Sequence, residues 1–309
     1  MIDNQISIVI PNWNGLEFLK LCIPSLIKAI NFSSYSCEII VVDNGSSDVS
    51  VDYLMSFFPG IRIILLNENL GFAAAMNIGI KEAKSDIVIG LNNDVIVEEG
   101  FIDPLVSHFL NDKKFFAVAA KMLLWDKKTL NFARAIGRFK FGVFRRTFQE
   151  SSITTNTLYA CGGAFAVDRD KFQKLGGFDE DMIAYWEDLD LCYRAWKQGY
   201  KTIYEPKSIV YHKFHGSYVK KCGQNGIRAI SGENYFLFAL KNFHDRSLFY
   251  QQLFSLPLLI LVAPLLGKSH FAKGLLRSLK RWPDFLKKRK EEKKRSIFSD
   301  RQVLYMSNQ

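Results

Sequence analysis

The chain has 309 residues, of which 48% are hydrophobic and 23% charged, values that are ordinary for a globular protein. This length is enough for one large domain or two small ones, each with a buried core. The formal net charge of +10 comes mainly from residues 267–309, where 13 Lys or Arg face four Asp or Glu, so residues 1–266 carry only +1. Because the basic residues are confined to one end, the charge does not predict a nucleic-acid-binding face on the core.

The cysteines argue against a disulfide framework and against a zinc site. Their number is odd, they are scattered, and none forms a C-x-x-C pair, a usage that suits a reducing cytoplasm. The N-terminus has no basic region before its first apolar run, so we expect no signal peptide. The five cysteines are Cys22, Cys37, Cys161, Cys192 and Cys222.

The first 97 residues alternate short apolar runs with segments of helical periodicity. This β-α order predicts a parallel sheet with helices on both faces, in which ligands bind beyond the carboxyl ends of the strands. The predicted strands are 6–10, 38–42, 61–66, 87–91 and 95–97, and the predicted helices are 16–30, 51–58 and 72–83.

Three polar clusters follow these strands and should converge on one edge of the sheet: 11–14, 43–47 and 92–94. A nucleotide fits this edge, because Asp43 could accept from a pyrimidine N–H and the backbone at Pro11 could meet the base. Asp94 at the tip of a buried strand needs a positive partner, such as a cation, a helix end or an Arg, unless it is only a turn residue. No G-x-G-x-x-G or Walker A sequence is present, which argues against a dinucleotide fold and a P-loop kinase.

The middle of the chain is less regular. Residues 125–156 contain seven Lys or Arg among aromatic residues, a pattern typical of a solvated loop or of a surface that meets an anionic acceptor or a membrane. The sequence leaves both interpretations open. A strand is predicted over 158–167, and its paired glycines, Gly162 and Gly163, indicate a bulge or the close approach of a ligand.

Residues 184–194 place three carboxylates, Glu187, Asp188 and Asp190, within four positions at the start of a predicted helix. Arg194 stands four residues after Asp190 and can pair with it. The cluster is either an acidic helix N-terminus stabilised by the helix dipole, or it supplies a base whose pKa is tuned by like charge. Two short strands, 202–205 and 209–211, then lead to His212, a candidate ligand.

Seven motifs in order resemble an inverting family 2 glycosyltransferase of the GT-A fold, closest to the bacterial rhamnosyltransferase-like branch. They span roughly residues 6–217. They read IVIPNWNG, IIVVDNGSSD, NENLGFAAAMNIG, LNND, CGGAFAVDRDKFQKLGGFDE, YWEDLDLCYR and VYHKFHGS. The resemblance implies an α/β GT-A catalytic domain over residues 1–222, with a mostly parallel central sheet and helices on both faces. Residues 1–110 would be its nucleotide-sugar-binding half and 111–222 its acceptor half, followed by a helical, basic, membrane-associating region over 223–309.

The resemblance also implies roles for individual residues. Asp188 matches the catalytic base. Asp94 and His212 match residues that hold Mg²⁺ or Mn²⁺. LNND stands where many relatives have D-x-D, so Asn92 replaces an acid and the ribose contact stays open between Asn92 and Asn93. The implied nucleotide-sugar site is Pro11, Asn12, Asn14, Asp43, Gly71, Asn92 and Asn93, and the residues near donor sugar and acceptor are Gly162, Gly163, Trp186 and Glu187.

The implied reaction moves a sugar, with rhamnose as a candidate, from a nucleotide-diphosphate donor to a glycan or lipid-linked acceptor in cell-surface polysaccharide synthesis. A mobile lid is expected at residues 212–218 or in the basic middle segment. The alternative is a catalytically inactive relative that binds a nucleotide-sugar or acts as a scaffold. A nucleotidyltransferase is disfavoured because no Gly-rich, Lys-bearing loop follows the first strand.

The last third of the chain is predicted to be helical over 225–240 and 248–266. Residues 253–266 are strongly apolar but too short for a membrane span, and Pro257 and Pro264 interrupt them. Lys and Arg cluster directly afterwards, the pattern of a peripheral membrane anchor. We therefore expect a cytoplasmic protein on the inner face of the cell membrane. The alternative is that the apolar stretch packs on the catalytic domain.

Overall fold

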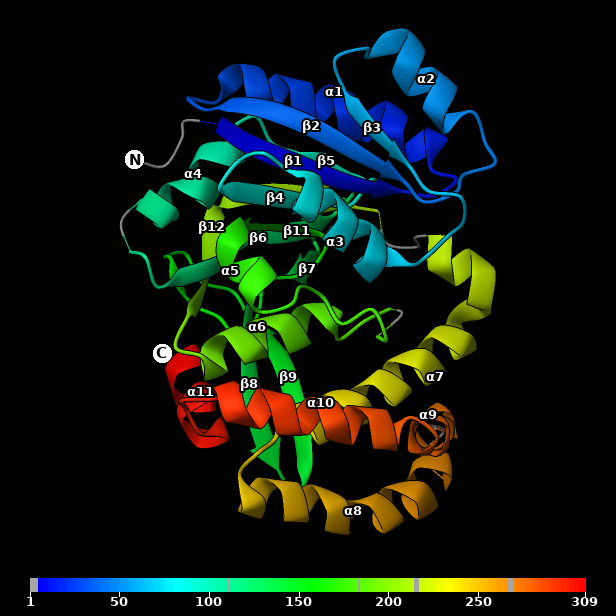
Figure 1. The fold of residues 1–309 in the computed structure, drawn as a ribbon, viewed down its shortest axis with the longest axis vertical. Coiled ribbons are helices and arrows are strands. Elements are labelled where there is room, and N and C mark those ends of the chain that lie inside the picture. The colour runs from blue at the N-terminus through cyan, green and yellow to red at the C-terminus, as the bar shows by residue number, and fades with distance from the viewer. Residues whose placement is uncertain (1–4, 111, 183, 214–216, 266–268) are drawn as a thin grey trace.

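A computed structural model describes residues 5–110, 112–182, 184–213, 217–265 and 269–309. The predicted lid segment 212–218 lies in part outside the described residues. Figure 1 shows the sheet with its flanking helices in the upper part of the molecule and the C-terminal helices in the lower part. The fold is therefore α/β, with a central sheet flanked by helices and a helical C-terminal region, as the sequence predicts.

The N-terminal strands form the parallel part of the sheet, in the order β4-β1-β2-β3. Apolar residues make this region the core, and all five residues of β4 are buried. The β-α order predicted for this half is confirmed. Its elements are β1 (Gln5–Asn12), α1 (Leu16–Phe32), β2 (Ser36–Asp43), α2 (Ser50–Phe57), β3 (Arg62–Leu65), α3 (Phe72–Glu82) and β4 (Ile87–Leu91).

The second half extends the sheet and makes it mixed. β11 lies antiparallel between β4 and β6, and the full order is β10-β12-β6-β11-β4-β1-β2-β3, with β5 on β12 and β7 on β6. The elements are β5 (Val95–Val97), α4 (Ile102–Val106), the 3-10 helix η1 (Ser107–Leu110), β6 (Phe115–Leu124), β7 (Leu130–Phe132), β10 (Thr155–Asn156), β11 (Ala164–Asp168), α5 (Arg169–Lys174), α6 (Glu187–Lys197) and β12 (Lys201–His212).

Two predictions for this half need correction, and one alternative that the sequence left open is removed. The basic segment is not a loop, because it contains the hairpin β8 (Arg134–Lys140) and β9 (Val143–Gln149), which reaches down to the C-terminal helices (Figure 1). Its interpretation as an interaction surface stays a prediction. The strand predicted over 158–167 is β11 alone, so Gly162 and Gly163 lie in a turn before it. The two strands at 202–211 are one long strand, β12, with a register shift between Glu205 and Ile209.

The C-terminal helices are α7 (Ser217–Asn242), α8 (Arg246–Leu265), α9 (Ser269–Leu279), α10 (Trp282–Arg295) and α11 (Asp300–Ser307). α7 packs against α9 and α10, and α11 packs against α6 and β8. Across the described ranges, no helix combines the length and the apolar character that crossing a membrane requires.

Buried ion pairs join these helices to α6. Lys197 Nζ lies 2.7 Å from Asp300 Oδ1 of α11, and Lys241 Nζ of α7 lies 2.9 Å from Asp190 Oδ2. The pair predicted between Arg194 and Asp190 is confirmed at 2.8 Å. Because a buried charge without its partner is strongly destabilising, α6 and the C-terminal helices depend on each other for their packing.

Candidate active site

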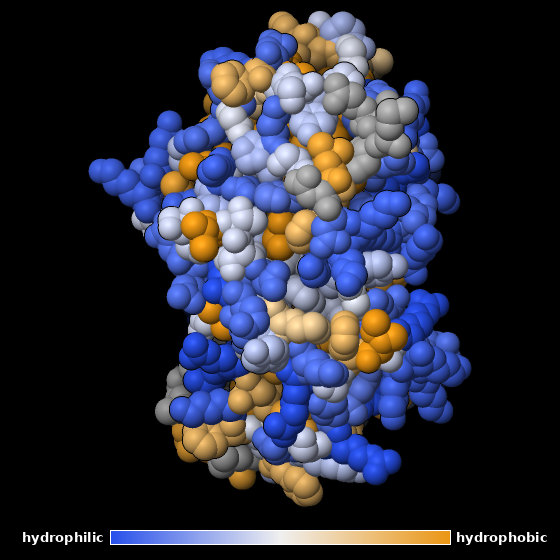
Figure 2. Space-filling view, turned by 90° about the vertical axis from the view of Figure 1, so that its left-hand side faces the viewer, coloured by the Kyte–Doolittle hydropathy of each residue, from blue (hydrophilic) through white to orange (hydrophobic). Residues whose placement is uncertain are grey.

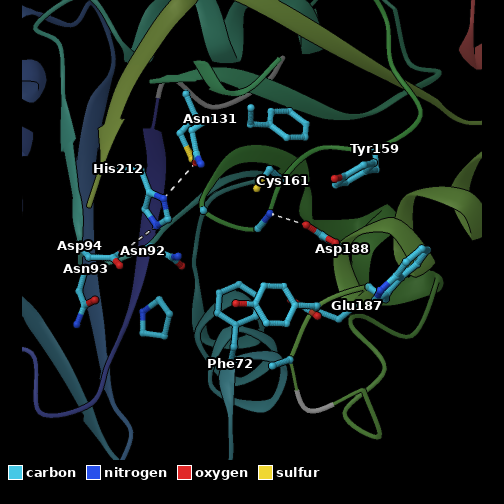
Figure 3. Close-up of a pocket in the computed structure, with 18 of the residues that line it drawn as sticks. Phe72, Asn92, Asn93, Asp94, Asn131, Tyr159, Cys161, Glu187, Asp188 and His212 are labelled. Carbon is cyan, nitrogen blue, oxygen red and sulfur yellow. Dashed lines mark hydrogen bonds and ion pairs between the residues drawn. The ribbon is translucent and has the colours of Figure 1, made fainter. Parts of the chain in front are cut away.

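A cavity of about 360 Å³ lies at the carboxyl ends of β1 and β4 and extends to the start of α6 (Figure 3). All three polar strand-end clusters reach it, 11–14 and 92–94 with several residues and 43–47 through Asn44, as the parallel order of the strands requires. Most of the predicted site residues line this cavity, and they come from both halves of the chain. They are Pro11, Asn12, Asn92, Asn93, Asp94, Gly162, Gly163, Trp186, Glu187, Asp188 and His212.

Three predicted nucleotide-binding residues, Asp43, Asn14 and Gly71, do not line the cavity. Asp43 is buried and accepts a hydrogen bond of 3.0 Å from Asn12 Nδ2. Asn14 Oδ1 accepts from the Ser47 backbone N–H at 2.7 Å. Gly71 precedes α3 with a φ of 91°, and its carbonyl accepts from Asn44 Nδ2 at 3.1 Å. These residues support the strand-end loops, and their contact with a nucleotide stays a prediction.

Asp94 and His212 meet at one end of the cavity, although 118 positions separate them in the chain. The antiparallel pairing of β5 with β12 sets His212 opposite Val95, next to Asp94. Figure 3 shows His212 between two partners: its Nε2 lies 3.3 Å from Asp94 Oδ1, and its Nδ1 lies 3.2 Å from Asn131 Oδ1. With this orientation of the Asn131 amide, Nδ1 donates, and in the neutral ring Nε2 then presents its lone pair to the carboxylate.

This arrangement fits a divalent cation. Asp94 Oδ1 is buried and accepts no hydrogen bond from the described residues, and an imidazole lone pair facing a carboxylate calls for a positive charge between them. Oxygen and imidazole nitrogen are suitable ligands for Mn²⁺, and oxygen for Mg²⁺. No cluster of three or more His, Cys, Asp or Glu suited to a metal occurs in the described part of the chain. A cation held by Asp94 and His212 would therefore need substrate or water oxygens to complete its shell.

Asp188 lies at the opposite end of the cavity, at the start of α6. Its Oδ2 accepts the Gly162 N–H at 3.1 Å, and its Oδ1 accepts the Leu189 N–H at 2.8 Å. A Cβ at Gly162 would lie 3.0 Å from the ring of Phe72 and 3.9 Å from Asp188 Cβ. The close approach that the paired glycines predicted is thus made by the protein's own side chains.

A strained turn presents the two adjacent carboxyl groups. Tyr185 and Trp186 both have a left-handed backbone, with φ of 65° and 77°, which is uncommon for aromatic residues. Glu187 follows them, and its Oε2 is buried without a hydrogen bond from the described residues. Burial, and then the charge of Asp188, hold the pKa of Glu187 well above its usual range. Burial also raises the pKa of Asp188, and the charge of Arg146 opposes that rise.

Sequence reasoning missed four cavity residues that stand near these carboxyl groups or the histidine: Asn131, Arg146, Tyr159 and Tyr185. Arg146 belongs to β9, within the basic segment interpreted as a loop or an interaction surface. The usable signal was the alternation in VFRRTFQ, in which Phe144 and Arg146 face the same side of a strand. Asn131 and Tyr159 carry no such signal, because only the tertiary fold brings them to the cavity.

Comparison with known proteins identifies the family. The family model of "Glycosyl transferase family 2" matches residues 7–176, more than half of the chain. The chain belongs to glycosyl transferase family 2. A second model, described as the N-terminal domain of galactosyltransferase, matches residues 143–216, which include the glycine pair, Asp188 and His212. Together the two family models match residues 7–216, which include the residues at both ends of the cavity in this family 2 chain.

Two curated relatives are similar at low identity. Poly-beta-1,6-N-acetyl-D-glucosamine synthase of Staphylococcus aureus (strain COL) is 25% identical over 225 residues, which are 67% of this chain and 52% of the relative. Polypeptide N-acetylgalactosaminyltransferase 5 of Rattus norvegicus is 27% identical over 199 residues, 57% of this chain and 21% of the relative. The family 2 chain therefore spans about half the length, or less, of these relatives.

Solved structures share the fold. GalNAc-T7, solved with UDP, GalNAc and Mn²⁺, gives a TM-score of 0.63 at 20% identity over 79% of this chain and 49% of that one. The mannosyltransferase PcManGT from Pyrobaculum calidifontis, solved with GDP-Man and Mn²⁺, gives 0.55 at 16% identity over 100% of this chain and 89% of that one. At these identities the likeness shows the GT-A fold alone.

The unpaired carboxyl of Glu187 makes stability depend on pH. In the folded chain its pKa is raised. Between the unfolded value of about 4.3 and the raised folded value, the folded state therefore binds more protons than the unfolded state. Stability should fall as pH rises through this window. Glu187→Gln keeps the neutral shape, so we expect it to match the wild type at pH 4 and to be more stable at pH 8. Denaturant unfolding at both pH values measures this difference.

Glu291→Gln, which changes a carboxylate on α10 whose side chain is 60% exposed, is the matched control and should not change the pH dependence. Equal pH dependence of the wild type and Glu187→Gln would mean that Glu187 ionises normally in the folded protein.

Proposed function

We propose that the protein is an inverting glycosyltransferase that moves a sugar from a nucleotide-diphosphate donor to a glycan or lipid-linked acceptor. The observation that carries the proposal is Asp188, a partly exposed carboxylate fixed by two backbone N–H groups at the opposite end of the cavity from Asp94 and His212. Such a carboxylate can accept a proton from an acceptor hydroxyl. The hydroxyl oxygen then forms a bond to the anomeric carbon, and the bond to the diphosphate breaks on the opposite face of the sugar.

Asp94 and His212 would hold Mg²⁺ or Mn²⁺ at the diphosphate end. The buried, unsatisfied Oδ1 of Asp94 and the imidazole beside it support this assignment. A bound cation would offset the negative charge that grows on the leaving diphosphate. Two solved structures of the same fold hold Mn²⁺, one together with UDP and GalNAc and the other together with GDP-Man.

The proposal extends to the identity of the donor sugar and to the class of the acceptor. The sequence resemblance favours a rhamnosyl donor, and the named activity of the Staphylococcus aureus relative adds N-acetylglucosamine as a second candidate. That relative makes a polysaccharide, which supports an acceptor in cell-surface polysaccharide synthesis.

Membrane association is the last part of the proposal. α8 exposes large apolar side chains on the end of the molecule away from α2 (Figure 1). At this lower end, Figure 2 shows hydrophobic residues among strongly hydrophilic ones. We propose that α8 lies on the inner face of the cell membrane and that the Lys and Arg of α9 and α10 contact anionic headgroups. The exposed residues are Tyr250, Leu253, Phe254, Leu261 and Leu265.

The proposed reaction is tested with a panel of nucleotide-diphosphate sugars that includes rhamnosyl, N-acetylhexosaminyl and hexosyl donors. Metal-dependent release of nucleoside diphosphate from one donor is expected for the wild type. Asp188→Asn should lose at least about 100-fold in turnover, because it keeps the shape and removes the base, while donor affinity stays within a few-fold. Asp170→Asn, an exposed carboxylate on α5, is the control.

Donor binding without turnover by the wild type would favour the inactive, nucleotide-sugar-binding alternative. Near-normal turnover of Asp188→Asn would show that Asp188 is not the base.

Asp94→Ala should lose metal binding and donor binding together, and His212→Ala should show a milder form of the same defect. The reason is that the carboxylate would contribute both charge and a ligand, whereas the imidazole contributes a ligand only. Calorimetric titration with Mn²⁺, in the presence and absence of the nucleoside diphosphate, measures both effects. Glu98→Gln, which changes a carboxylate after β5 that hydrogen-bonds Tyr211, is the control. Unchanged metal-dependent affinity in Asp94→Ala would contradict the assignment.

The 309-residue protein should sediment with vesicles that contain anionic lipid at low salt and dissociate as salt screens the basic residues. Phe254→Ser combined with Leu261→Ser should weaken this binding, because both side chains are more than 70% exposed on α8. Phe57→Ser, which changes a 69% exposed side chain on α2, is the matched control. Failure of the wild type to sediment at low salt would rule out the membrane contact.

A further inference from the structure

Arg146 is a cationic residue that enters the cavity from the side of the β8–β9 hairpin. Its guanidinium carbon lies 4.7 Å from the ring centroid of Trp186 and 5.3 Å from that of Tyr159. Among the described residues it forms no ion pair within 4 Å, although it lines the same cavity as Glu187 and Asp188. The guanidinium is therefore held by two aromatic rings and not by a carboxylate, which leaves its charge available to the cavity.

The ring that Arg146 contacts is part of the turn that presents the base. Trp186 has a left-handed backbone and directly precedes Glu187 and Asp188. The indole is also fixed on its other side, because its Nε1 donates to Ser231 Oγ at 3.1 Å and its ring packs against Phe238. Replacing Arg146 would therefore remove one of the contacts that hold the Trp186 turn in place.

Arg146 also balances the charges around Asp188. The titratable groups that face Asp188 are Glu187 and Cys192 on α6, Tyr159 and Cys161 on the loop before β11, and Arg146 on β9. Arg146 is the cation of this set, and every other member is neutral or acidic. Burial and then the charge of Asp188 raise the pKa of Glu187 well above its usual range, whereas at Asp188 the charge of Arg146 opposes the rise in pKa that burial causes.

We propose that Arg146 is a positioning residue for the base: held against Trp186 and Tyr159, its guanidinium keeps Asp188 charged and oriented toward the acceptor hydroxyl. This inference rests on the proposed function, since it assigns a partner to the same base. In the transfer step the acceptor O–H bond breaks and its proton moves to an Asp188 oxygen. The electron pair of that bond forms the new bond to the anomeric carbon, and the diphosphate leaves with the pair of the broken bond. Arg146 stays protonated throughout.

The test measures the ionisation of Asp188 directly, without donor or acceptor. In protein labelled with ¹³C at aspartate carboxyl groups, Asp188→Asn identifies the resonance of Asp188, whose titration midpoint is then followed against pH. Arg146→Met should move this midpoint to higher pH, because the opposing positive charge is lost. Arg146→Lys keeps the charge without the planar contact and should titrate closer to the wild type.

The matched control is Arg145→Met. Arg145 is exposed, precedes Arg146 on β9 and points to the other face of the hairpin, so its loss should leave the midpoint of Asp188 unchanged. If Arg146→Met does not fold, Arg146→Gln, which keeps a planar group against Trp186, gives the decisive measurement. An unchanged midpoint in the neutral variant, or an equal shift in Arg145→Met, would overturn the inference.

A rate profile provides the second measurement once a donor is known. The acidic limb of kcat/KM should move to higher pH in Arg146→Met, with about a tenfold loss below the midpoint for each pH unit of displacement and recovery at high pH. A pH-independent loss would show a merely structural role and overturn the inference. Absence of transfer by the wild type would overturn the proposed function and leave the carboxyl titration interpretable.

Discussion

The structure depends on the complete burial of α6, a helix that carries five charged residues and has almost no solvent-exposed face. Asp188 is the one residue of α6 that is partly exposed to solvent, while Asp190, Arg194 and Lys197 are buried. Charges in such a place must be paired, because an isolated buried charge costs several kcal/mol, on the order of 3–5 when one partner of a pair is removed. Every charge on the far side of α6 therefore needs a partner from another element.

Those partners come largely from the C-terminal helices. Burial alone would raise the pKa of Asp190, yet Lys241 of α7 and Arg194 hold it below its usual value. Lys197 pairs with Asp300, which also accepts a hydrogen bond from Tyr193 Oη at 2.8 Å. The C-terminal helices thus fix the helix that carries the proposed base, in addition to forming the surface proposed to meet a membrane.

The other end of the cavity is fixed by the sheet. β5 pairs with β12 and thereby sets His212 beside Asp94, and the Lys213 N–H donates to the Asp94 carbonyl at 3.0 Å. The Asn92 N–H donates to the Gly163 carbonyl at 3.0 Å, which joins the strand-end cluster to the glycine turn. Since Gly162 in that turn donates to Asp188, a short chain of backbone contacts connects the two ends of the cavity. Backbone groups therefore form most of the links between the proposed metal and base positions.

The parallel half of the sheet and the strand-end clusters were predictable, because strand and helix periodicity fix which ends of β1 and β4 meet. Asp188 and His212 followed from the family resemblance. Arg146 was not found, because its neighbours are also basic and a run of charge usually indicates solvent exposure. The burial of Asp190 and Arg194 was also missed, since three carboxylates in four positions indicate an exposed helix start unless the partners from α7 and α11 are known.

Helix geometry explains why three such close carboxylates acquire three different environments. Asp190, Arg194 and Lys197 are spaced by four and three residues, so they share the face that the C-terminal helices cover. Asp188 is two residues from Asp190, a rotation of about 200° around the helix axis, and therefore points to the opposite side, into the cavity. Glu187 lies between these faces and has, among the described residues, neither a cation at hydrogen-bond distance nor open solvent, which is why burial raises the pKa of its carboxyl. One turn of helix thus holds a structural carboxylate, a proposed base and a carboxyl group whose pKa is raised.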